Sequence, residues 1–255
     1  MSTFLGKGTY GKVTKINGTA VKDFQKLSHI IQEHIALKYL DDCNYIIKGL
    51  GVNYKKKELS MVLCDMSLRK WLNQKNNCKC LDCIHKIIHD ILCGLVELQD
   101  RNLSHSDIKP GNILIQKHPL KAVLGDCGFV SLAKYSKQDR TAPAYRDIVI
   151  VADDKHDIYS FGICFLELLY KVKRRLYENY NDIKDTINND VHNSDHRKLL
   201  FKMLHPNRNM RPSARELLQL LYKETPDKFI IQPADINEEI LLKNLKKKYY
   251  HLDIP

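Results

Sequence analysis

The chain has none of the sequence features of a membrane-spanning, secreted or repetitive protein. Within its 255 residues there is no apolar run near the roughly 18 residues of a membrane helix, no cleavable signal sequence, no internal repeat and no low-complexity linker. We therefore expect a soluble, intracellular protein of the cytoplasm or nucleus. In that setting the eight cysteines are expected to be free thiols rather than disulfides.

Acidic residues are scarce beside basic ones. The chain carries 41 Lys and Arg against 30 Asp and Glu, a formal net charge of +11, with basic clusters at Lys55-Lys56-Lys57 and Lys246-Lys247-Lys248. This charge favours acidic partners. Aromatic residues do not alternate with the clusters as a base-stacking surface requires, so we do not expect nucleic-acid binding as the main function. Acidic protein substrates or docking surfaces fit the charge better.

Two segments in the middle of the chain carry the most information. They read His105-Ser106-Asp107-Ile108-Lys109-Pro110-Gly111-Asn112-Ile113-Leu114 and Gly125-Asp126-Cys127-Gly128. Asp107 can orient a hydroxyl and accept its proton, and Lys109 can reach a transferring phosphate. Asn112 and Asp126 offer the hard oxygen ligands that suit Mg²⁺. This set of side chains predicts phosphoryl transfer.

A glycine-rich loop lies near the N-terminus. It reads Leu5-Gly6-Lys7-Gly8-Thr9-Tyr10-Gly11-Lys12-Val13. Its glycines would let backbone N–H groups close over phosphates. A dinucleotide-binding fold would need a helix directly after the glycines, whereas Val13 to Ile16 and Ala20-Val21 predict two short strands around the hairpin turn Asn17-Gly18. The loop therefore indicates a strand-turn-strand cover over a nucleotide.

A lysine and a glutamate are expected to pair behind this loop. Lys22 ends the segment Thr19-Ala20-Val21-Lys22. Glu33 is the only Glu between Lys22 and Glu58, and it lies on a predicted helix over residues 28–40. Since Glu33 precedes Leu37 by one helical turn, both belong to the inward face. An ion pair between Lys22 and Glu33 is what the family resemblance given in the next paragraph implies.

Together these motifs resemble the glycine-rich loop, Val-Ala-Ile-Lys strand, catalytic loop and Asp-Phe-Gly motif of eukaryotic serine/threonine protein kinases. The likeness covers about residues 5–222, and the small size is similar to kinases of large DNA viruses. It implies ATP and Mg²⁺ as cofactors, protein substrates, and serine/threonine specificity, because Lys109 follows Asp107 by two residues. It implies a catalytic role for Asp107 and Lys109 and a metal-binding role for Asn112 and Asp126. The implied nucleotide contacts are the loop residues 5–13, Ala20, Lys22, Glu33, Leu63 and Leu114.

The resemblance also implies an α+β fold with two lobes. We expect a small β-rich lobe over residues 1–63 with one main helix, and a larger, mostly helical lobe over residues 67–225. Residues 64–66 would form the hinge whose backbone pairs with adenine, with Leu63 at the back of the pocket and Leu114 as its floor. Because only four residues precede Leu5, we expect a nearly truncated first strand and a mobile small lobe.

Apolar periodicity places the remaining elements. Strands are predicted from Ile46-Ile47 to Val52 and from Leu59 to Leu63, and helices over residues 81–98 and 157–170. Asp157 is expected to anchor the catalytic loop, to cap its own helix, or to do both. Residues 226–255 form an extension with a basic amphipathic helix, which we expect on its own domain, with contact to a membrane surface as the lesser alternative.

Several residues depart from the kinase pattern. Ser106 replaces an arginine that pairs with a phosphate on the activation loop, so we predict activity that does not depend on activation-loop phosphorylation. Cys127 replaces a phenylalanine and buries less apolar area. The Ala-Pro-Glu motif has become Asp147-Ile148-Val149, and we predict that Asp147 takes over the lost glutamate's pairing with Arg211.

These departures support a rival interpretation, a pseudokinase scaffold that binds partners without turnover. Ala142 adds to them, since it occupies the place of a threonine that Thr141 could replace. Against this reading, all seven residues of the chemical centre are present: Lys22, Glu33, Asp107, Lys109, Asn112, Asp126 and Gly128. We therefore favour an active enzyme. Its oligomeric state is not predicted.

A cysteine-rich stretch offers a separate site. Cys78, Cys80, Cys83 and His85 are soft or borderline ligands that could hold Zn²⁺. No second paired cluster accompanies them, so free thiols remain the favoured reading.

Overall fold

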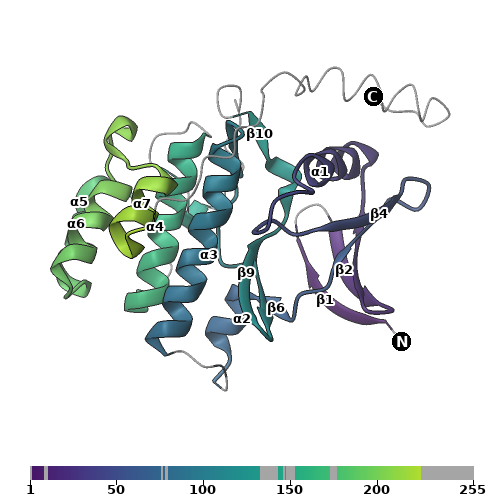
Figure 1. The fold of residues 1–255 in the computed structure, drawn as a ribbon, viewed down its shortest axis with the longest axis horizontal. Helices are drawn as coiled ribbons and strands as arrows, with labels where there is room; N and C mark the ends of the chain where they lie inside the picture. Colours follow the sequence, from purple (N-terminus) through teal and green to yellow (C-terminus); the bar gives the residue numbers. More distant parts are fainter. Residues whose placement is uncertain are drawn as a thin grey trace.

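The computed structural model describes residues 2–8, 11–75, 77, 80–132, 143–145, 147, 153–172 and 177–224. The described residues form two lobes, a β-sheet lobe with one helix and a larger helical lobe, which face each other in Figure 1. The predicted α+β architecture is confirmed. None of the helices in the described ranges is both long and apolar enough to cross a membrane.

The small lobe is one antiparallel sheet with a helix on it. The strand order is β1-β2-β3-β5-β4. The elements are β1 (Thr3–Lys7), β2 (Gly11–Ile16), β3 (Thr19–Phe24), α1 (Leu27–Tyr39), β4 (Gly49–Asn53) and β5 (Glu58–Val62). The β2–β3 turn falls at Asn17 and Gly18, both with positive φ, as the hairpin prediction requires. Helix α1 begins one residue before the predicted start.

The large lobe combines small sheets with a helical core. Its strands are β6 (Met66–Ser67), β7 (Leu103–Ser104), β8 (Ile113–Lys117), β9 (Leu120–Leu124) and β10 (Ser131–Leu132). Its α-helices are α2 (Leu68–Asn73), α3 (Leu81–Gln99), α4 (Asp154–Tyr170), α5 (Tyr180–Asp190), α6 (Ser194–Met203) and α7 (Ala214–Tyr222). Short 3₁₀ turns cover η1 (Cys127–Phe129), η2 (Pro143–Tyr145) and η3 (Arg208–Met210). Helices α3 and α4 run side by side through this lobe (Figure 1).

Two expectations about the small lobe were wrong. The first strand is not nearly truncated: β1 pairs with β2 from Thr3 opposite Lys15 to Lys7 opposite Lys12. The pairing register shifts between Phe4 and Gly6, and the strand continues past this irregularity to Lys7. The predicted strand start at Ile46 was also wrong, since β4 begins at Gly49 and Ile46 instead forms an isolated parallel bridge to Leu124. The expected mobility of the small lobe stays a prediction.

Helix α4 begins earlier than the sequence indicated. Its N-cap is Asp153, whose side chain accepts a hydrogen bond from the His156 backbone N–H. The N-cap role considered for Asp157 was therefore wrong. This leaves the Asp157 carboxylate in the first turn of a helix that is buried on almost every side, where it can bond elsewhere.

Candidate active site

The predicted Lys22–Glu33 ion pair is present and includes a third partner. Lys22 Nζ donates to Glu33 Oε2 at 2.6 Å and to Asp126 Oδ1 at 2.7 Å. Lys22 lies on β3 and Glu33 on α1, whereas Asp126 follows β9 with a left-handed φ of 58°. The two lobes thus meet at one ammonium group.

The charges of this triad follow from burial and attraction. Burial lowers the pKa of Lys22, but Glu33 and Asp126 outweigh it and raise that pKa above its ordinary value. Burial raises the pKa of Glu33 to about 7. For Asp126, burial is the largest single effect and raises the pKa, but attraction and hydrogen bonding to Lys22, together with the nearby His105 and Lys109, outweigh burial, so the pKa is lowered. Lys22 is therefore cationic and Asp126 anionic at neutral pH.

A pocket adjoins the triad. It is lined by Phe24, His29, Gln32, Glu33, Asp126, Gly128 and Phe129. Glu33 Oε1 is buried and has no hydrogen-bond partner among the described residues, so half of this carboxylate is held by Lys22 and half is unused.

The catalytic-loop carboxylate has one oxygen fixed and one available. Asp107 Oδ2 accepts from Lys109 Nζ at 2.6 Å and from Asn112 Nδ2 at 2.7 Å. Oδ1 is buried and has no partner in the part of the chain that the structure describes. Burial raises the pKa of Asp107, and attraction to Lys109 opposes this only in part. The free oxygen is therefore a stronger base than an ordinary aspartate, which suits proton acceptance.

Asn112 and Asp126 present oxygens that suit a divalent cation. The Asn112 side-chain Nδ2 donates to Asp107, and the Asn112 backbone oxygen accepts from Gly125 N at 2.8 Å. Within the described residues, Asn112 Oδ1 and Asp126 Oδ2 accept no hydrogen bond. Oxygen donors of this kind, one of them anionic, fit Mg²⁺.

Asp157 anchors the catalytic loop, as expected. Its Oδ2 accepts from His105 N at 2.6 Å and its Oδ1 from Ser106 N at 2.8 Å. These bonds hold Ser106 at a φ of 63°, a left-handed conformation that serine rarely adopts. Burial raises the pKa of Asp157 to about 7. Sequence reasoning missed His105, whose Nε2 lies 3.0 Å from Gly125 O and joins the loop to the Asp126 segment.

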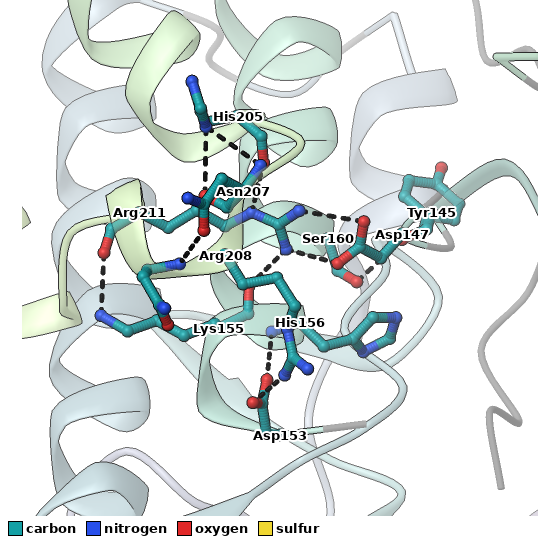
Figure 2. Close-up of polar contacts among 11 residues, drawn as sticks. Tyr145, Asp147, Asp153, Lys155, His156, Ser160, His205, Asn207, Arg208 and Arg211 are labelled. Atoms are coloured by element: carbon teal, nitrogen blue, oxygen red, sulfur yellow. Dashed lines mark hydrogen bonds and ion pairs between the residues drawn. The ribbon is translucent and has the colours of Figure 1, made fainter. Parts of the chain in front are cut away.

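Asp147 pairs with Arg211, as predicted. Figure 2 shows the guanidinium facing both carboxylate oxygens, with Nη2 to Oδ1 at 3.0 Å and a shorter contact from Nη1 to Oδ2. Both side chains are fully buried. Arg211 also donates to the backbone oxygens of His205 at 2.8 Å and Lys155 at 3.1 Å. The pair is thus closed on all sides by protein.

A second, partly buried network was not predicted. Tyr145 OH donates to Glu167 Oε2 at 2.8 Å, and Arg69 Nη2 donates to the same oxygen at 3.0 Å. These residues lie on η2, α4 and α2. No local spacing could have revealed them, since Arg69 and Glu167 are 98 residues apart.

The described residues among the predicted nucleotide contacts of the small lobe lie on its first three strands and next to them. Leu5, Gly6 and Lys7 are on β1, Lys12 and Val13 on β2, and Ala20 on β3, while Gly8 donates its N–H to Gly11 O at 2.9 Å. Thr9 and Tyr10 lie outside the described residues. Gly11 has a packing reason as well, because a Cβ there would lie 2.1 Å from Asp23 O.

The hinge connects the two sheets. Leu63 follows β5 and is half-buried, and Asp65 N donates to Ile115 O at 2.9 Å. Leu114 lies on β8 and packs against Gly125, where a Cβ would come within 2.8 Å of its side chain. Leu63 and Leu114 thus lie on the two sides of the hinge.

Several residues named in the sequence analysis lie outside the described ranges. These are Cys78, Thr141, Ala142 and the whole of residues 225–255. Cys80 Sγ accepts a hydrogen bond from Cys83 N at 3.4 Å and caps α3. Among the described residues, no three His, Cys, Asp or Glu side chains are arranged to hold a metal ion.

A two-lobed fold with a lysine, a glutamate and two oxygen ligands gathered beside a fixed aspartate defines a protein kinase domain. The family model for the protein kinase domain matches residues 1–223, and the chain belongs to this family.

Curated relatives agree with this assignment. The mouse interferon-induced, double-stranded RNA-activated protein kinase is 25% identical over 257 residues, covering 85% of this chain and 49% of the relative. An Acanthamoeba polyphaga mimivirus protein whose name describes it as a serine/threonine-protein kinase is 28% identical over 256 residues, covering 85% and 46%. Cell division control protein 2 homolog 2 of Trypanosoma brucei brucei is 27% identical over 188 residues, covering 64% and 54%. The chain thus spans about half the length of these relatives.

Proposed function

We propose that this protein transfers the γ-phosphate of ATP to serine or threonine hydroxyls of protein substrates. The observation that carries the proposal is the junction of Lys22, Glu33 and Asp126, which brings a phosphate-binding cation and an anionic metal ligand together across the two lobes. An active kinase requires both parts in place.

Each residue has a task in this reaction. Lys22 binds the α- and β-phosphates, and Glu33 aims it. Asn112 and Asp126 would hold Mg²⁺, which neutralises phosphate charge when bound. Asp107 Oδ1 accepts the hydroxyl proton of the substrate, while Lys109 and Asn112 fix Oδ2 and thereby the direction of the carboxylate. Lys109 also lies close enough to Asp107 to stabilise charge on the transferring phosphate.

The preference for serine and threonine is proposed from Lys109 and from the names of the relatives, which are serine/threonine kinases in part. The net charge of +11 supports acidic protein substrates. We further propose a location in the cytoplasm or nucleus, of a host cell if the protein is viral.

Independence from activation-loop phosphorylation is part of the proposal. Ser106 carries no charge with which to bind a phosphate, and its hydroxyl lies 2.9 Å from the Ser104 hydroxyl. The Lys22–Glu33 pair is nevertheless formed. The formed pair supports the proposal that this arrangement does not depend on a phosphate paired at position 106.

The test is transfer of radiolabelled phosphate from ATP to casein and to a generic basic protein. Wild type is expected to label the substrate, with Asp107→Asn and Lys22→Met reduced to background. Lys15→Met is the matched control, because Lys15 is an exposed lysine of the same sheet, and it should label like wild type. Equal labelling by wild type and both site variants would show that the label comes from another source.

The alternative is a catalytically weak or inactive pseudokinase. Cys127 favours it, since this small side chain is buried beside Glu33 and Asp126 where a phenylalanine would bury more area. A pseudokinase would bind ATP with Mg²⁺ but transfer no label to either substrate.

A further inference from the structure

The segment after α1 connects the small lobe to the strand that leads to the active site. Tyr45 O accepts from Leu124 N at 2.8 Å, and Ile47 N donates to Leu124 O at 2.8 Å. Leu124 ends β9 and lies two residues before Asp126. Residues 41–47 therefore join α1, which carries Glu33, to β9, the strand that leads to Asp126.

A buried carboxylate on α3 holds this segment. Glu97 Oε1 accepts from Asn44 N at 2.7 Å, and Glu97 Oε2 accepts from Tyr45 N at 2.9 Å. Glu97 is only 4% exposed. A carboxylate that accepts two neighbouring backbone N–H groups makes two charge-assisted hydrogen bonds, which are about twice as strong as neutral ones.

An arginine braces the same segment from the other side. Arg101 Nη1 donates to Glu97 O at 2.9 Å, and its Nη2 donates to Asp42 Oδ2 at 2.6 Å. The Arg101 side chain is 1% exposed, whereas that of Asp42 is 63% exposed. Glu97 and Arg101 thus form a clamp on residues 41–47, built entirely from the large lobe.

We propose that Glu97 is a positioning residue for nucleotide binding, which holds residues 41–47 on β9 and so keeps Lys22 and Glu33 opposite Asp126. The inference deepens the proposed kinase function and rests on it. It supplies a reason why the Lys22–Glu33 pair forms although Ser106 cannot bind an activation-loop phosphate. The clamp holds the segment that follows α1, so its action would not require a phosphate on the activation segment.

The chemistry of the clamp makes it sensitive to a change of one atom. Both carboxylate oxygens accept an N–H, so Glu97→Gln places an NH₂ donor opposite a backbone donor. One of the two hydrogen bonds is then lost and a buried N–H is left unpaired, with little change in side-chain volume.

The test compares two ligands on the chain of 255 residues. ATP with Mg²⁺ needs the Lys22–Asp126 junction, whereas adenosine has no phosphate and contacts the hinge alone. For Glu97→Gln we expect the affinity for Mg²⁺ and ATP, measured by calorimetry, to fall about tenfold, the effect of roughly one hydrogen bond. The affinity for adenosine should stay within twofold of wild type.

Asp90→Asn is the matched control. Asp90 is also buried on α3, and its Oδ2 also accepts a backbone N–H of β9, from Ala122 at 2.9 Å, while its Oδ1 accepts from Lys86 Nζ at 2.5 Å, so its hydrogen bonds differ from those that Glu97 makes to the backbone of Asn44 and Tyr45. This variant should bind both ligands like wild type. An equal loss of ATP affinity in both variants, or a loss of adenosine affinity in Glu97→Gln, would mean general loosening and would overturn the proposal.

A second variant keeps the test decisive if Glu97→Gln does not fold. Arg101→Lys retains the charge but can bond only one of Glu97 O and Asp42, so ATP affinity should fall about threefold and adenosine affinity should not change. Unchanged ATP affinity refutes the clamp. Label transfer by the wild type tests the proposed function separately. If the wild type transfers label but Glu97→Gln binds Mg²⁺ and ATP with unchanged affinity, the clamp is refuted and the kinase function stands.

Discussion

Two regions differ in how closely they follow the sequence motifs of protein kinases. One is the chemical centre around Lys22, Glu33 and Asp126, and the other is the buried Asp147–Arg211 pair, here called the support. At the centre, Lys22, Glu33 and Asp126 occupy the motif positions and meet within 2.7 Å. In the support, Asp147 replaces a glutamate at another position and still reaches Arg211. The residue types of the centre are constrained because particular atoms would have to bind phosphate and metal. The support needs only a buried anion opposite its arginine.

The largest expected effect breaks the centre. Asp107→Asn removes the oxygen that accepts the substrate proton, so kcat should fall by about 10²–10⁴-fold. ATP affinity and thermal stability should change little, because Asn can still accept the hydrogen bond from Lys109. Steady-state kinetics with casein measures this loss. A decrease of less than threefold would remove Asp107 from the chemistry.

Breaking the support should affect stability instead. Arg211→Met removes the guanidinium that donates to both oxygens of the buried Asp147 carboxylate, and breaking a buried ion pair in this way should cost about 3–5 kcal/mol in the free energy of unfolding. Urea unfolding of the single variant and of Arg211→Met/Asp147→Leu measures it, and the double variant should recover part of the loss because no charge stays buried. A loss below about 1 kcal/mol in the single variant would contradict the observed geometry.

The pH dependence of stability tests the anchor between the two regions. Burial raises the pKa of Asp157 to about 7, above its ordinary value, so the native state binds a proton that the unfolded state releases. Its contribution is therefore full at low pH and is lost as pH rises towards 7, with a slope of up to about 1.4 kcal/mol per pH unit. The difference in unfolding free energy between wild type and Asp157→Asn, measured from pH 4 to 8, should show this slope. A constant difference would mean that Asp157 is ionised throughout.

The smallest expected effect is that of removing phosphate from the protein, because Ser106 stands in place of the phosphate-binding arginine. Phosphatase treatment of purified protein should change the rate of label transfer by less than twofold, because no arginine at position 106 pairs with a phosphate. Mass spectrometry before and after treatment confirms that phosphate was removed. A drop of tenfold or more would show that another cation performs the missing arginine's task.

Much of the centre could be predicted from the sequence because its residues lie in short segments with fixed spacing. Asp107, Lys109 and Asn112 fall on one loop, and the hairpin dipeptide Asn17-Gly18 sets the register of the strands before Lys22. Local rules suffice where the contacts are local. The Asp147–Arg211 pair could also be predicted, because Asp147 is an acidic residue close in sequence to the position of the missing glutamate.

Other contacts could not be predicted because they join residues far apart in the chain. The Glu97 bonds to residues 44 and 45 span more than 50 positions, and the Arg69–Glu167 contact spans 98. The length of β1 was misjudged because strand pairing, rather than the number of preceding residues, decides where a strand begins. Likewise, the N-cap of α4 depends on where Asp153 can reach a free N–H.

The groups of the proposed chemistry can be read from the motifs alone: one base, two lysines and two oxygen ligands, in segments whose spacing allows few other uses. How these groups are held depends on the folded chain: Lys22 donates to Asp126, one oxygen of Asp107 accepts no hydrogen bond from the described residues, and Glu97 accepts hydrogen bonds from the segment after α1. The reason is physical. Residue type fixes what a side chain can donate or accept, whereas burial and three-dimensional proximity decide which partner it meets and which proton it keeps.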